Sequence, residues 1–101
     1  MNSCLTIVLP KFFEEDLVDH LLEHPEWVAG FTTTTDVDGH GRAVSYHGSA
    51  EEVRGRAARV QIQIVMEQAD TQPLIAHLKE RVHSGEIAYW VTPVIEFGRF
   101  A

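Results

Sequence analysis

Cysteine is nearly absent from the sequence, which contains Cys4 alone among its 101 residues. One chain can therefore form no internal disulfide, and it cannot supply the cysteine set of a structural zinc site. Long hydrophobic runs are also missing, and a membrane-spanning helix needs roughly 20 apolar residues in succession. The opening Met1–Pro10 carries no basic region and lacks the pattern of a signal peptide. We expect a cytoplasmic protein with no segment inserted in a membrane.

Basic residues are scarce as well. Lysine and arginine total 8 against 15 aspartates and glutamates, which gives a formal net charge of −7. A negative surface repels phosphate backbones, so we expect no nucleic-acid partner. The basic residues of the second half are grouped at Arg54, Arg56 and Arg59, which leaves room for a local site that binds a small anion.

Hydrophobic periodicity places six elements in a single domain spanning residues 1–101. Apolar residues make up 45% of the chain, an ordinary value for a globular domain. The expected strands alternate between apolar and polar residues, whereas the expected helices repeat their apolar residues every three or four positions. The strands are 4–9, 27–37, 58–67 and 87–97, and the helices are 13–24 and 70–84. Asp70 or Thr71 is expected to cap the second helix and Gly85 to end it.

The order β-α-β-β-α-β predicts an α+β fold of the ferredoxin-like kind. Both helices should then cover one face of a four-stranded antiparallel sheet. The spatial order would be 4-1-3-2, with the last strand at an edge, where Pro93 needs no amide proton. The other face lacks a helix layer although the second and last strands carry aromatic residues. We therefore expect a homo-oligomer that buries this face.

An enzymatic activity is not expected on this fold. Acylphosphatase chemistry requires an arginine and an asparagine that positions water, and Asn2 is the only asparagine of the chain. No nucleophile with a paired base appears in the sequence. An RNA-binding sheet is also disfavoured, because the third strand offers Gln61 and Gln63 where stacking aromatic residues are needed.

Short segments along nearly the whole chain form a pattern that resembles the PII signalling proteins. A Thr-rich segment, Gly30–Thr33, runs into Val37–Arg42, and Tyr46–Gly48 follows. These three segments are similar, in that order, to the Thr-rich strand, the V-x-G-x-G-R turn and the Y-R-G segment of that family. With His24-Pro25 and the ending Tyr89–Val94, the sequence is most similar to a PII-like family often encoded beside heavy-metal efflux pumps. CutA proteins are related to it.

This resemblance implies a non-enzymatic regulatory homotrimer with ligand clefts between its subunits. It would signal through the 38–53 loop, with a membrane efflux or transport protein as the implied partner. The implied effector is a divalent metal ion or a small anion. PII proteins hold nucleotide phosphates with a Gly-Asp-Gly-Lys turn, whereas this chain has Ser84–Ala88 there, so ATP is not the expected effector. The alternative is a CutA-like protein that binds divalent metals and confers metal tolerance.

The turn formed by Gly39, His40, Gly41 and Arg42 is the first candidate ligand site. Glycines allow successive backbone N–H groups to face an anion, and Arg42 adds a planar positive charge. The alternative is an ordinary hairpin turn between two strands.

Arg54 and Arg56, with Arg59 nearby, form the second candidate ligand site. Guanidinium groups bind phosphate or carboxylate in a bidentate manner. These arginines could instead pair with the acidic residues 51–52 or with a neighbouring subunit. Tyr46 lies near the position at which some PII proteins are uridylylated, but its neighbours differ, so that modification is not expected here.

Histidines are the candidate metal ligands. His40 and His47 flank the loop and could converge on a metal in a trimer, or they could simply face solvent. Asp16, His20 and His24 follow one another at i, i+4 spacing, which suits chelation of a divalent ion but also fits the solvated face of a helix. The remaining histidines, His77 and His83, are expected at the surface of the second helix.

Three aromatic residues could line a cleft or pack in the core or an interface: Trp27, Tyr89 and Trp90.

Overall fold

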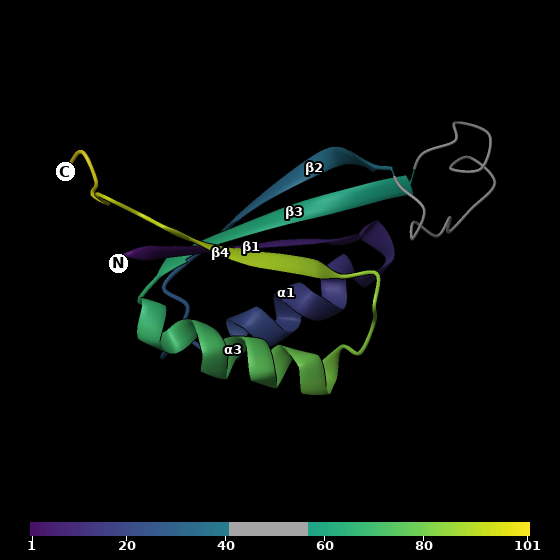
Figure 1. The fold of residues 1–101 in the computed structure, drawn as a ribbon, viewed down its shortest axis with the longest axis horizontal. Helices are drawn as coiled ribbons and strands as arrows, with labels where there is room; N and C mark the ends of the chain where they lie inside the picture. Colours follow the sequence, from purple (N-terminus) through teal and green to yellow (C-terminus); the bar gives the residue numbers. More distant parts are fainter. Residues whose placement is uncertain (41–56) are drawn as a thin grey trace.

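The computed structural model describes residues 1–40 and 57–101, and it has the α+β architecture expected from the sequence (Figure 1). The elements are β1 (Ser3–Pro10), the short 3-10 helix η1 (Lys11–Phe13), α1 (Glu14–Leu22), β2 (Thr32–Gly39), β3 (Ala57–Met66), α3 (Gln68–Arg81) and β4 (Ala88–Pro93). Within the described ranges, no helix is long and apolar enough to cross a membrane.

The four strands form one antiparallel sheet in the order β2-β3-β1-β4. This confirms the expected order, including the edge position of the last strand. Pro93 is the final residue of β4 and lies opposite Ser3 of β1. Both α1 and α3 lie on the same side of the sheet (Figure 1). The described helices therefore leave the opposite face of the sheet bare.

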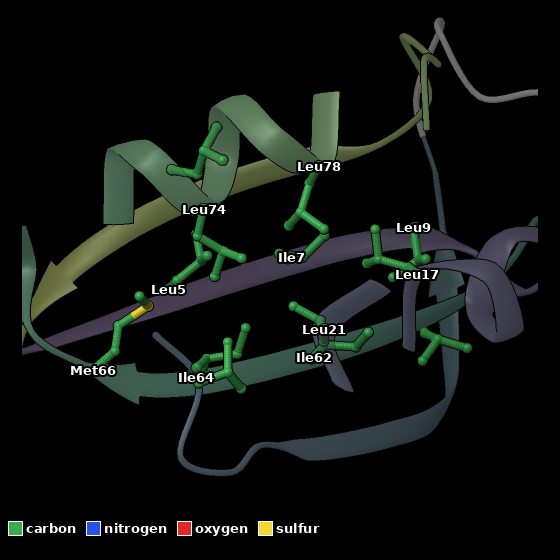
Figure 2. Packing of buried hydrophobic residues seen from close by; sticks show 13 residues of the cluster. Leu5, Ile7, Leu9, Leu17, Leu21, Ile62, Ile64, Met66, Leu74 and Leu78 are labelled. Carbon is green, nitrogen blue, oxygen red and sulfur yellow. The ribbon is translucent and has the colours of Figure 1, made fainter. Parts of the chain in front are cut away.

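The hydrophobic core fills the space between the sheet and the two helices (Figure 2). Alternate residues of β1 and β3 point into it, as their period of two predicts, and they pack against apolar residues of α1 and α3. Burying one such side chain contributes about 1.5–3 kcal/mol. The core residues that Figure 2 labels are Leu5, Ile7, Leu9, Leu17, Leu21, Ile62, Ile64, Met66, Leu74 and Leu78.

Helix α3 begins and ends earlier than the sequence predicts. Its N-cap residue is Glu67, so the expected cap at Asp70 or Thr71 is wrong. Thr71 instead donates its hydroxyl to the Gln68 carbonyl oxygen at 2.7 Å. The cap comes from a distant residue, because the Asn2 side-chain oxygen accepts the backbone N–H of Gln68 at 2.8 Å. The helix ends at Arg81, before the expected stop at Gly85.

We expect Asn2→Ala to lower the free energy of unfolding by about 0.5–2 kcal/mol, because it leaves the Gln68 N–H at the helix start without its acceptor. Asn2→Asp retains an acceptor there and should stay near wild type. Urea unfolding of both variants at equal protein concentration makes the comparison. Equal losses for the two substitutions would contradict a capping role.

The second strand is shifted along the sequence relative to the expected 27–37. Trp27 and Val28 lie in a turn after α1, where both backbone N–H groups donate to the His24 carbonyl oxygen at 3.1 and 2.9 Å. Strand β2 starts at Thr32 and continues to Gly39, with a bulge between Thr34 and Val37. The turn after α1 therefore holds residues 27–28, which the sequence assigned to the strand, and the strand begins only at Thr32. The last strand is also shorter than the expected 87–97, because β4 ends at Pro93.

Candidate functional site

The base of the connection between β2 and β3 lies at one end of the sheet. Gly39 pairs with Ala57 at the last described positions of the two strands. Val8 of β1 lies opposite both Gln61 of β3 and Ala88, the first residue of β4. The segment that leads from α3 into β4 therefore reaches the same end of the sheet (Figure 1). The end of the sheet near which the sequence predicts a ligand site thus carries the last described residues of β2 and the first of β3 and β4.

The described chain contains only part of that predicted site. Gly39 is strand-paired, and His40 is an exposed residue directly after β2. The pairing of Asp38 and Gly39 extends β2 by two residues into the segment assigned to the loop. The other predicted ligand and metal residues lie outside the described residues, as does Tyr46: Gly41, Arg42, His47, Arg54 and Arg56.

Arg59 supplies a buried positive charge near this end of the sheet. It lies opposite Pro10 of β1 and Val37 of β2, and it is 6% exposed. Its guanidinium donates to the Ala58 carbonyl oxygen at 3.3 Å. The planar guanidinium group binds the paired oxygen atoms of anions such as carboxylate or phosphate. Arg59 is thus the one arginine of the predicted basic group that the structure describes.

An apolar pocket of about 380 Å³ opens beside the segment between α3 and β4. Residues from β1, α1, α3 and β4 line it, so no single motif in the sequence announces it. At its rim Lys79 Nζ lies 5.1 Å from the centre of the Tyr89 ring and donates to the Tyr89 hydroxyl at 3.4 Å. A pocket of this size and composition suits a small molecule with an apolar body and an anionic group that faces Lys79. Its apolar lining includes Ile7, Leu17, Ile75, Leu78, Val82 and Ile87.

Two histidines, His24 and His77, are not placed as the sequence predicts. His24 follows α1 instead of lying in its last turn, whereas the exposed Asp16 agrees with the alternative of a solvated helix face. His77 is half-buried, not at the surface, because its ring packs 4.1 Å from that of His24. Within the described ranges, no three His, Cys, Asp or Glu side chains form a ready metal site.

The three aromatic residues lie in different environments. Trp27 packs against the core, which agrees with the packing alternative. Tyr89 and Trp90 are neighbours in the edge strand β4 and are each nearly half-exposed. Tyr89 lines the apolar pocket, whereas Trp90 lies on the bare face because it pairs with Thr6.

Comparison with known proteins identifies relatives of this chain. The model of the DUF3240 family, described as a protein of unknown function, matches residues 1–101. A solved structure of a DUF3240 family protein from Shewanella baltica OS155 is similar, with a TM-score of 0.79 and 19% identity over 99% of this chain and 97% of that one. The search of curated proteins found no match.

Two further solved structures connect the fold to PII-like proteins. CPII from Thiomonas intermedia K12, a nitrogen regulatory PII-like protein bound to ADP, AMP and bicarbonate, has a TM-score of 0.73 and 18% identity over 97% of this chain and 93% of that one. A PII-like signalling protein from Thermus thermophilus has a TM-score of 0.61 and 15% identity over 92% of this chain and 85% of that one. Because the family match spans the whole sequence, the chain belongs to the DUF3240 family, and it has the fold of PII-like proteins.

Proposed function

We propose that this protein is a non-enzymatic, PII-like regulatory homotrimer that binds a small ligand in clefts between subunits and signals through the 38–53 loop. The observation that carries the proposal is the bare face of the sheet. A ligand that favours one arrangement of the loop over another would shift the population of the trimer toward that arrangement.

The bare face has the composition of a surface that another chain covers. Cys4 and Val8 of β1 and Val65 of β3 are only partly buried there, and Trp90 is 47% exposed. At the end opposite the loop base, a hollow of about 600 Å³ opens on this face. An exposed apolar face of this kind on a single chain favours association. Three copies arranged around one axis would cover the bare faces of all three.

The segment after β4 adds apolar surface beside the bare face. The Val94 N–H donates to the Asn2 carbonyl oxygen at 2.9 Å, after which the chain extends away from the sheet (Figure 1). Ile95 and Phe100 are fully exposed, and Phe97 is 44% exposed. In the proposed trimer, these side chains contact a neighbouring subunit.

The ligand class follows from the pocket and from the basic residues around the loop. The pocket is apolar with Lys79 at its rim. Arg54 and Arg56 belong to the part of the sequence that connects β2 to β3. CPII shares the fold and is bound to ADP, AMP and bicarbonate. We therefore assign a small anion as effector and use these three compounds as the first probes.

Arg54→Ala combined with Arg56→Ala is expected to weaken binding of the anion at least tenfold, because a hydrogen bond to a charged group contributes about 1.5–3 kcal/mol. Isothermal titration with AMP, ADP and bicarbonate measures the affinities, and light scattering confirms that the variant is still a trimer. Arg81→Ala, an exposed arginine at the end of α3, is the matched control. Equal affinities for the double variant and wild type would contradict the assignment of these arginines.

The partner in this proposal is a heavy-metal efflux or transport protein. This choice of partner rests on the sequence resemblance alone. A divalent metal ion is the alternative effector on the same grounds. Co-purification with the cytoplasmic part of such a transporter, with and without the bound effector, tests the partnership. Retention that does not respond to any effector would contradict a regulatory role.

A further inference from the structure

His24 and His77 form a contact that joins the turn after α1 to the C-terminal half of α3. Their ring centres lie 4.1 Å apart with the planes at 73°. The Trp27 ring stacks on the His24 ring, with the ring centres 5.1 Å apart and the two planes at 19°. None of these three residues lines the pocket at the loop end. The contact is therefore a separate feature of the molecule that the proposed function leaves unexplained.

One nitrogen of each imidazole in this contact has no hydrogen bond. The Nε2 atoms of both His24 and His77 are inaccessible to solvent and lack a partner. A buried polar atom without a hydrogen bond destabilises the folded chain unless something else satisfies it. A single ligand bound by both lone pairs would satisfy the two atoms together.

Glu26 fixes the orientation of the His24 ring. Its Oε1 lies 2.7 Å from His24 Nδ1, at the exposed edge of the cluster. The Glu26 carboxylate oxygen can only accept this hydrogen bond, so Nδ1 of His24 is the donor. The lone pair of His24 is then on Nε2, the buried atom. Histidines that bind metals have this same carboxylate partner on their other nitrogen.

We propose that His24 and His77 bind one divalent transition-metal ion, such as Zn²⁺, Ni²⁺ or Cu²⁺, through their Nε2 atoms, with the coordination completed by water that enters as the two rings separate. Imidazole nitrogen is a common ligand of these ions. Metal–nitrogen bonds of about 2.0–2.1 Å in tetrahedral geometry place two ring centres about 5 Å apart. The ring centres, now 4.1 Å apart, therefore need to separate by about 1 Å for both Nε2 atoms to bind one ion. This site stands whether or not the proposed function does.

Titration of the metal-free protein with Zn²⁺, Ni²⁺ and Cu²⁺ by calorimetry tests the site. We expect saturable binding of one ion per chain, and at least a tenfold loss of affinity in His24→Ala and in His77→Gln. His83→Ala, an exposed histidine beyond the end of α3, is the matched control and should bind as wild type. Thermal unfolding of each variant without metal shows that the fold is retained. No saturable binding to wild type, or unchanged binding in both His24→Ala and His77→Gln, overturns the proposal.

Two further readouts locate the metal. Glu26→Gln should weaken binding about 10–100-fold, because the exposed carboxylate orients His24 without touching the metal. In a Trp90→Phe background, Trp27 is the only tryptophan, and its stacking on His24 should make Cu²⁺ quench its fluorescence in parallel with the calorimetric binding. Saturable binding that leaves Trp27 emission unchanged would place the ion elsewhere and overturn the proposal.

Discussion

Replacing Ile62 by alanine is expected to lower the free energy of unfolding by about 2–5 kcal/mol. Ile62 is fully buried near the middle of β3, one of the two central strands of the sheet. It lies opposite Ile7 on β1 and belongs to the core between the sheet and the helices (Figure 2). The substitution removes three carbons from a site enclosed by both the sheet and a helix. The remaining cavity adds to the lost transfer free energy because the strands on either side limit collapse.

Urea unfolding monitored by circular dichroism measures this effect. The protein concentration is held constant, since association would make the apparent stability depend on it. Gln72→Ala, an exposed position on α3, is the control and should stay within about 0.5 kcal/mol of wild type. A loss below about 1 kcal/mol for Ile62→Ala would contradict the central place of this residue in the core.

Trp90→Glu is expected to convert the proposed trimer into monomers at micromolar concentration. Trp90 lies on the bare face of β4, opposite Thr6, and is 47% exposed in the single chain. Large aromatic residues at the centre of an interface commonly contribute about 2 kcal/mol or more to association. The substitution removes that contact and places an uncompensated carboxylate in each copy of the interface, which costs several further kcal/mol.

Tyr89→Glu is the matched control for this experiment. Tyr89 is the adjacent residue of the same strand and is similarly exposed at 42%, but it lies on the helix side, near Lys79. The new carboxylate would face the Lys79 ammonium, so the trimer should persist. Light scattering gives the mass of each variant in solution. A monomeric wild type, or a trimeric Trp90→Glu variant, would contradict self-association through the bare face.

The sequence by itself determined the fold class, the strand order and most of the core. Alternation in β1 and β3 identified their buried sides, and the spacing of Leu74, Ile75 and Leu78 identified the buried side of α3. These patterns are local, because each face of a strand or helix repeats at a fixed period. The edge position of β4 also followed from a local fact, the missing amide proton of Pro93.

Only the tertiary structure decided which residues far apart in the sequence meet. Asn2 caps α3 although a local cap at Asp70 or Thr71 matched the usual pattern. His77 contacts His24 although its position suggested an exposed site on the helix. Periodicity specifies which way a side chain points, but the packing of one element against another specifies what it touches. The helix cap, the histidine contact and the apolar pocket all depend on that packing, so none of them could be predicted from the sequence.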